Sequence, residues 1–278
     1  MTSALVHWEQ GEKIISTLDR ERSEMKRPTV ENIVKYLNKE LRVRTIKDTS
    51  ANGLQVRLRK SRQIGIIGFA VDACISTFEK AKKLDVDLLV VHHGIRWRPQ
   101  NDKDLANIRE AYLKKSSMAL YAAHLPLDLH EEYGNNMQLA RLLGVQEPKK
   151  FGRYHGIKIG YAGVFKKTEN LSSIAKKLNT HLKSTCRIYR FGKKKIRSIG
   201  IISGGGGGIL GDVVNEGLDC FLVGEIDLAI YNAAKEHGMN LIIAGHYATE
   251  TVGVKALMPL VRRSFSVKTV FISDTKNL

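Results

Sequence analysis

Long apolar runs and paired cysteines are two features that this 278-residue sequence lacks. A membrane-spanning helix needs about 20 consecutive, mostly apolar residues, and no such stretch occurs, so we expect no membrane association. The opening residues, MTSALVHWEQ, also lack the basic-then-apolar pattern of a secretory signal. Cys74, Cys186 and Cys220 stand far apart and without CxxC spacing. This spacing argues against a cysteine-based metal site and favours free, buried thiols in a cytoplasmic protein.

Acidic residues are few compared with basic ones: the sequence has 28 aspartates and glutamates and 45 lysines and arginines, which gives a formal net charge of +17. Such a balance favours contact with polyanions, such as nucleic acid or nucleotides. The basic residues come in short bursts, for example RLRKSR at 57–62 and GKKKIR at 192–197, and no RNP motif or zinc finger accompanies them. A generally basic, solvated surface is the competing interpretation. The charge therefore indicates a tendency and not a function.

The chain divides into an N-terminal extension, two α/β halves and a C-terminal segment. Residues 1–24 are highly charged with a weak apolar pattern, and we expect them to be disordered or to form one helix. After Thr29, a suitable N-cap, apolar residues recur at helical spacing and predict the first helix of the first half. We place the first half at 25–132 and the second at 133–250. A C-terminal helix and strand that return to the first half are expected at 251–278.

Two copies of one α/β unit account for the pattern of the halves. In each copy, three apolar runs alternate with helical patterns, as expected for parallel strands that are buried on both faces. The predicted strands are 64–70, 87–92 and 118–123 in the first copy and 199–203, 219–223 and 239–244 in the second. Alignment of the copies matches His124 with His246 and Asp128 with Glu250. Both third strands therefore lead into His-x-x-x-carboxylate.

Five metal-binding side chains follow predicted strand ends: His92, His93, Asp128, His246 and Glu250. Ligands of open parallel sheets bind beyond the carboxyl ends of the strands, so we expect these residues to hold two divalent ions in a cleft between the halves. Imidazole and carboxylate suit zinc, iron, manganese, nickel or cobalt. Side chains alternate along a strand, so His92 and His93 are poorly placed to hold one ion together. Each can serve a different ion of a close pair, or one of them can support a ligand without binding an ion. Two divalent ions carry four positive charges, and the two carboxylates supply only two negative ones. The remaining positive charge favours a bound hydroxide, which is suited to hydrolytic chemistry.

Two more side chains and a glycine run belong to the same predicted cleft. His124 either orients a ligand or is structural, and Glu225 is a second candidate. Either side chain is suited to proton transfer. The SGGGGG run at 203–208 favours a phosphate cradle, although it lacks the Lys-Ser/Thr of a Walker loop. A tight turn between a strand and a helix, beside the metal cleft, is the competing interpretation.

Five segments resemble the Nif-three-like dinuclear metal centre family, whose members are also described as GTP cyclohydrolase I type 2 homologues. These segments are ANGLQV (51–56), VVHHG (90–94), AHLPLDLHEEYGNNMQLARLLG (123–144), DCFLVGEI (219–226) and AGHYATETVGVKAL (244–257). The resemblance runs from about Met25 to the C-terminus. It implies two intertwined, duplicated three-layer α/β/α halves with mixed sheets, assembled as a toroidal homohexamer that is a trimer of dimers.

The resemblance also implies ligands and an activity. The family's metal ligands fall on the same five side chains, His92, His93, Asp128, His246 and Glu250, and the implied activity is ring-opening hydrolysis of GTP. In one departure, the family's Asp-Asn-Ser-Gly-Leu-Gln is replaced by TSANGLQ at 49–55, so the leading acid is missing there.

Two classes of function follow from these observations. One is a metal-dependent hydrolase that acts on a nucleotide or a related anionic heterocycle. The other is a basic, toroidal nucleic-acid-binding or scaffold protein in which the metals are structural or regulatory. Turnover of GTP tests the first class, and the salt dependence of nucleic-acid binding tests the second.

Overall fold

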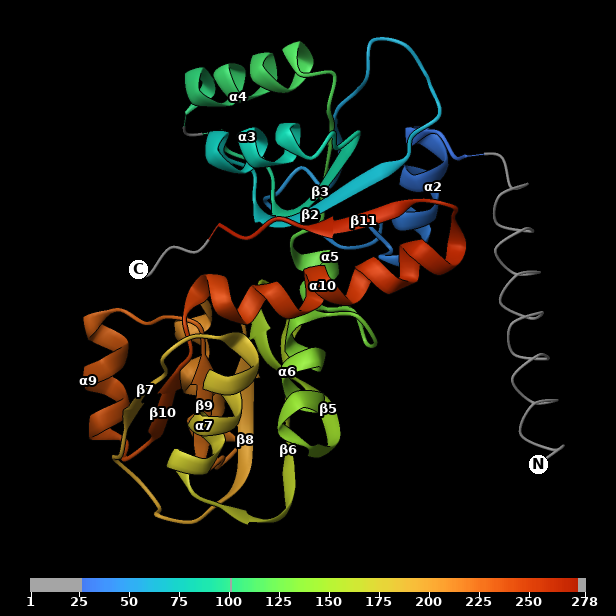
Figure 1. Cartoon of the computed structure of the whole chain (residues 1–278). Coiled ribbons are helices and arrows are strands. Elements are labelled where there is room, and N and C mark those ends of the chain that lie inside the picture. Colours follow the sequence, from blue (N-terminus) through green and yellow to red (C-terminus); the bar gives the residue numbers. More distant parts are fainter. Residues whose placement is uncertain (1–26, 101, 275–278) are drawn as a thin grey trace, which may run out of the picture.

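The computed structural model describes residues 27–100 and 102–274. In this part of the chain, the strands form a five-stranded and a six-stranded sheet. The long helix α10 (His246–Ser264) lies between the two sheets (Figure 1). The extension predicted at 1–24 lies outside the described residues. No described helix is both long and apolar enough to cross a membrane.

The first sheet has the strand order β1-β4-β3-β2-β11, in which β1 runs antiparallel to β4 and the other neighbours are parallel. One face packs against α2 and α10, and the other packs against α3 and α4. As predicted, Thr29 caps α2, with a reciprocal pair of hydrogen bonds to Asn32. The elements are α2 (Val30–Glu40), β1 (Gly53–Val56), β2 (Ile66–Asp72), α3 (Ile75–Lys83), β3 (Leu88–His93), α4 (Lys103–Lys115), β4 (Ala119–Ala122) and β11 (Lys268–Phe271).

The second sheet has the strand order β5-β6-β8-β9-β10-β7. Its parallel centre, β8-β9-β10, is flanked by the antiparallel hairpin β5-β6 on one side and by antiparallel β7 on the other. Apolar clusters cover both faces of this sheet too. The elements are α6 (Asn135–Leu143), β5 (Val145–Tyr154), β6 (Ile157–Glu169), α7 (Leu171–Leu182), β7 (Arg187–Tyr189), β8 (Ile196–Ile202), η1 (Gly206–Ile209), α8 (Leu210–Asn215), β9 (Cys220–Val223), α9 (Leu228–Glu236) and β10 (Asn240–Ile243).

These sheets confirm the predicted α/β fold with two mixed sheets. The strands predicted at 87–92 and 219–223 correspond to β3 and β9, each displaced by a residue at its start. The predicted duplication agrees with the parallel three-strand centre that both sheets share, whereas the domain boundaries stay a prediction. Of the free cysteines, Cys220 is buried as expected, but Cys74 and Cys186 are partly exposed, so that expectation was wrong for two of them.

In both sheets, an aspartate just before the second parallel strand accepts hydrogen bonds from the backbone at the start of the first parallel strand. Asp87 accepts two backbone N–H hydrogen bonds at the start of β2, and Asp219 accepts two at the start of β8. Each also pairs with a basic side chain from the preceding loop, Arg62 with Asp87 at 2.6 Å and Lys193 with Asp219 at 2.7 Å. The same local arrangement in both halves agrees with a duplication.

We expect Asp219→Asn to lower the free energy of unfolding by about 1–3 kcal/mol, because a charged acceptor of several hydrogen bonds is lost. Burial opposes ionisation of Asp219, but Lys193 and the backbone N–H groups outweigh it and lower the carboxyl pKa. This contribution is present above the ordinary aspartate pKa of 3.8 and is lost as the pH falls below it. Urea unfolding at pH 7 and pH 3 measures the effect. A difference between variant and parent that is equally large at pH 3 would contradict it.

Candidate metal centre

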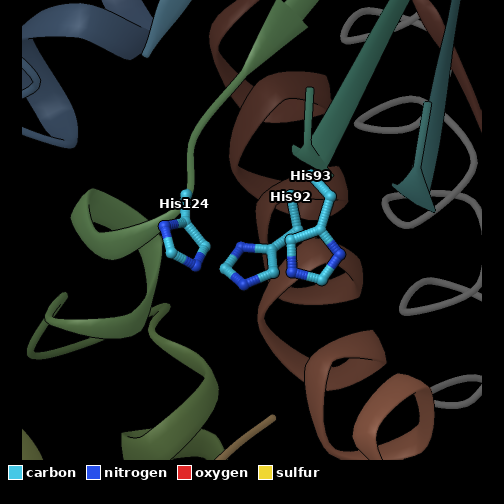
Figure 2. A group of neighbouring side chains, drawn as sticks. All are labelled: His92, His93 and His124. Atoms are coloured by element: carbon cyan, nitrogen blue, oxygen red, sulfur yellow. The ribbon is translucent and has the colours of Figure 1, made fainter. Parts of the chain in front are cut away.

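The carboxyl ends of β3 and β4 deliver three histidines to the junction of the two halves. β3 ends with His92 and His93, and β4 is followed by His124 and the short helix α5 (Leu125–Asp128). Figure 2 shows the three imidazole rings gathered around one space. Their ligand atoms lie within 4.8 Å of one another.

Helix α10 brings donors from the second half to the same space. It begins at His246 and carries Glu250 one turn later, so both side chains leave the helix on one face. Glu250 Oε1 lies 3.5 Å from His92 Nε2 and 3.1 Å from His246 Nε2. Glu250 Oε2 lies 3.4 Å from His93 Nε2, and Asp128 Oδ2 lies 3.6 Å from His92 Nε2. The five residues predicted as ligands therefore form one cluster, with Glu250 at its centre.

The neighbours His92 and His93 approach different oxygens of Glu250. His92 follows Leu88 and Val90 onto the face of β3 that packs in the same core as α10, and its side chain is fully buried. His93 leaves on the opposite face and stays 20% exposed. Because His93 is the last residue of β3, its ring still reaches Glu250 at the open end of the sheet. The two rings nevertheless remain close enough for their ligand atoms to lie within 4.8 Å of each other, so the expectation that they are poorly placed to hold one ion together was wrong.

Each of the four imidazoles has its Nδ1 fixed by an oxygen atom, which leaves Nε2 facing the centre. The pairs are His92 with the carbonyl of Ala123 (3.0 Å), His93 with Asp72 (2.9 Å), His124 with Asp48 (3.0 Å) and His246 with Glu225 (2.9 Å). A carbonyl or carboxylate oxygen accepts here, so Nδ1 carries a proton, and Nε2 is the nitrogen that is directed to the centre. Histidines that bind metals usually have such a partner on the other nitrogen.

Asp48 is a residue of the centre that the sequence analysis missed. Its carboxylate accepts hydrogen bonds from His124 Nδ1, the Asn52 side chain and the backbone N–H groups of Ser50 and Leu125. Burial would raise the pKa of Asp48, but His124 outweighs it and lowers the pKa to about 2. Asp48 directly precedes the TSANGLQ segment. An acid is therefore present just before that segment, and this position is the signal that identifies it.

Buried amides hold Asp128 from the side of the second half. Asn135 donates to Asp128 Oδ1 at 2.8 Å, and the Ser203 hydroxyl donates to the same oxygen at 3.2 Å. The Asn135 side-chain oxygen accepts from the backbone N–H of Gly253 in α10 at 2.8 Å. Oδ1 is thus engaged, and Oδ2 is the oxygen that faces His92. Asn135 was not predicted as a site residue. Its position in the NN pair of the segment 123–144, which resembles the family, is the feature that could have identified it.

The charges of the cluster depend closely on one another. Burial lowers the pKa of His92, but Asp128 and Glu250 outweigh it and raise the pKa to about 10. The hydrogen bond to Glu250 raises the pKa of His246 to about 9. Burial opposes ionisation of Glu250, yet His92 and His93 outweigh it and hold its pKa well below the usual range. The carboxylates therefore stabilise positive charge in this space.

The donor set fits divalent cations. Among the described residues, His92 Nε2 and Glu250 Oε2 are buried without a hydrogen-bond partner. A buried polar atom left unpaired costs about 1–3 kcal/mol, so each needs a partner. Two overlapping groups of ligand atoms are close enough to hold an ion: His92 with His93 and His124, and His93 with His246 and Glu250.

The sequence model of Duf34/NIF3 (NGG1p interacting factor 3) matches residues 28–277. The chain belongs to this family. It is 44% identical over 250 residues to the GTP cyclohydrolase 1 type 2 homolog of Pyrococcus abyssi, which covers 89% of this chain and 99% of that protein. The homolog of Archaeoglobus fulgidus is 36% identical over 247 residues, 88% of this chain and 98% of that protein. The crystal structure of TTHA1606 from Thermus thermophilus matches with a TM-score of 0.80 at 34% identity, over 90% of this chain and 100% of that chain.

The glycine run of this Duf34/NIF3 chain passes directly beside the centre. Gly204 has a φ of +62°, and a Cβ added there would lie 2.2 Å from Glu250 Oε1. The Gly204 carbonyl also accepts a hydrogen bond from the backbone N–H of Glu225 at 3.0 Å. Any side chain at Gly204 would therefore displace the central carboxylate. The run forms a tight turn that leads from β8 into η1 and α8, as in the second of the two interpretations.

We expect Glu225→Gln in this NIF3 chain to weaken metal binding by about 10- to 100-fold, because the partner that orients His246 loses its charge. The Glu225 side chain is 59% exposed, so the substitution does not open the core. Competition for zinc with a chromophoric chelator measures the affinity. Asp72→Asn, at the equivalent position behind His93, is the matched variant. Unchanged affinity in both variants would contradict the orienting role.

Proposed function

We propose that this chain binds two divalent metal ions and uses them to hydrolyse a nucleotide. One arrangement carries the proposal: four imidazoles, fixed through Nδ1, direct Nε2 into the space around Glu250. The name of the relatives, GTP cyclohydrolase 1 type 2 homolog, suggests a guanine nucleotide as the substrate. The mixed imidazole and carboxylate donors suit zinc, iron, manganese, nickel or cobalt.

Distances support a division of the ligands between two ions. His92 and Asp128 face each other on the buried side of Glu250, and His93 and His246 lie on its more exposed side. We assign the first pair to one ion and the second pair to the other. Glu250 Oε1 lies near His92 and His246, and Oε2 lies near His93, so Glu250 would help to hold both ions.

The surrounding residues divide the remaining tasks. Bound divalent ions would supply the Lewis acidity that hydrolysis of a nucleotide needs at neutral pH. Glu225 contacts His246 Nδ1 and therefore orients a ligand. His124 is held by buried Asp48 and points its other nitrogen towards His92 and His93. This placement favours His124 over Glu225 as the residue that moves a proton to or from the substrate.

Turnover of GTP by the metal-loaded protein tests the proposal. We expect the chain loaded with zinc, manganese or iron to convert GTP, and His246→Ala to reduce the rate at least about 100-fold because one ion loses a ligand. His237→Ala, at an exposed histidine at the end of α9, is the control and should keep the parent rate. A protein that retains its ions but converts no GTP would reject the hydrolase function.

A basic ring that binds nucleic acid is the second candidate, and exposed basic segments favour it. The basic side chains of 57–62 and the three lysines of 193–195 are exposed, and each copy has a formal charge of +17. We propose that copies assemble as a homohexamer, a trimer of dimers, which sedimentation equilibrium can measure. Oligonucleotide binding should then weaken steeply as salt rises. Binding that does not change with salt would remove this candidate.

A further inference from the structure

We propose that Trp97 is the surface against which the metal centre takes a flat, ring-containing ligand, so that a nucleotide is recognised through its base. The inference rests on the proposed function and names the part of the substrate that the protein itself contacts. Nothing in the ligand set requires an aromatic residue. The placement of this indole therefore needs its own explanation.

Trp97 lies directly beside the imidazoles of the centre. Its ring centroid is 5.1 Å from that of His124, with an interplanar angle of 71°, and 6.1 Å from that of His93. The side chain is only partly buried. The indole therefore forms a wall at the accessible side of the cluster and is not part of a closed core.

The position of this wall is fixed by hydrogen bonds. The indole Nε1–H of Trp97 donates to the carbonyl of Gly94 at 3.1 Å, and its backbone N–H donates to Gln100 Oε1 at 2.9 Å. The backbone on either side of Trp97 pairs with residues 49–51. Because the indole is already held in place, a ligand that binds to it does not pay the entropy cost of ordering the side chain, and this favours binding.

Gln55 connects the loop of Trp97 to the rest of the site. Its Oε1 accepts from the backbone N–H groups of Ile95 at 2.7 Å and Arg96 at 3.2 Å. The same side chain packs so closely that a Cβ on Gly94 would lie 2.4 Å from it. Gln55 and Gly94, from two of the segments quoted above, therefore set where the indole stands relative to the histidines of β3.

The chemistry of a fixed indole selects the class of ligand. Since the ring N–H of Trp97 is already bonded, the side chain offers only its π-surface and edge. Every nucleobase presents a π-face, and stacking on an aromatic side chain strengthens binding without base-specific hydrogen bonds. The cations of the centre would take the anionic part of the same ligand. A base joined to phosphate satisfies both requirements.

Single-tryptophan variants provide the test. The chain has two tryptophans, so in a Trp8→Phe background the fluorescence comes from Trp97. With zinc bound, we expect GMP to quench this fluorescence. In calorimetric titrations, which do not need the indole as a reporter, Trp97→Leu should bind GMP at least about tenfold more weakly, whereas Trp97→Phe should stay within about threefold of the parent. Inorganic pyrophosphate, which has no ring, should bind parent and both variants equally in calorimetric titrations.

Several outcomes would overturn the inference. Unchanged affinity of Trp97→Leu for GMP would show that the indole does not contact the ligand. An equal loss for GMP and pyrophosphate, or reduced zinc content, would show that the indole only supports the histidines. A zinc-loaded parent that binds no GMP would overturn it as well. Zinc content is therefore measured first on every protein. A parent chain that holds no zinc would reject the proposed function together with the inference.

Discussion

Glu250→Gln is expected to remove both metal ions from the protein. The carboxylate is the shared neighbour of the cluster, with one oxygen 3.5 Å from His92 and 3.1 Å from His246 and the other 3.4 Å from His93. An amide keeps the volume but has no negative charge and replaces one acceptor oxygen with a donor group. We expect zinc affinity to fall well beyond the roughly 100-fold that loss of a supporting partner causes.

Elemental analysis after dialysis against buffered zinc measures this effect as ions per chain. Glu236→Gln, at the exposed C-terminal end of α9, is the matched control and should keep two ions. Two ions retained by Glu250→Gln would reject a bridging role. One ion retained would show that Glu250 belongs to a single site.

Removal of the ions by a chelator should lower the melting temperature by at least about 10 °C, which is the effect expected from one ion. A ligand present at 1,000 times its dissociation constant stabilises the folded state by about 4 kcal/mol, and each kcal/mol shifts the melting temperature by about 2–4 °C in a chain of this size. The structure provides the reason for a large effect. Without an ion, His92 Nε2 and Glu250 Oε2 are buried without hydrogen-bond partners among the described residues, and they belong to different halves of the chain.

Thermal unfolding with and without EDTA measures the shift, and zinc added back should reverse it. In Glu250→Gln the chelator should have no effect, because the ions are already absent. Identical melting curves for loaded and stripped parent protein would mean that the ions do not stabilise the fold.

The parts of the fold that the sequence predicted are those that depend on local patterns. Continuous apolar runs marked the parallel strands, and donors placed directly after them were expected to meet in a cleft between the two halves, because ligands bind beyond the carboxyl ends of parallel strands. This reasoning brought His92, His93 and Asp128 together with His246 and Glu250, as the structure has them. Their role as ligands stays a prediction.

Contacts between distant segments were missed, since no local pattern marks them. Asp48 supports His124 across 76 positions, and Asp72 supports His93 across 21. The position of Asp48 before TSANGLQ marks it as a residue of the centre but does not show that its partner is His124, and nothing near Asp72 indicates a contact with His93. The long hairpin β5-β6 was also missed, because its exposed, charged residues hide the strand period.

The pairing of β11 with β2 determines when the first sheet can be completed as the chain is synthesised. β11 pairs in parallel with β2, and α10, which precedes it, packs between the sheets. On the ribosome, this edge of β2 therefore stays open until β11 has emerged. His246 and Glu250 arrive on the same helix, so capture of the proposed ions would be a late event that coincides with completion of the first sheet. The two halves cannot be separated by a cut between them, because the C-terminal end of the chain belongs to the sheet near its start.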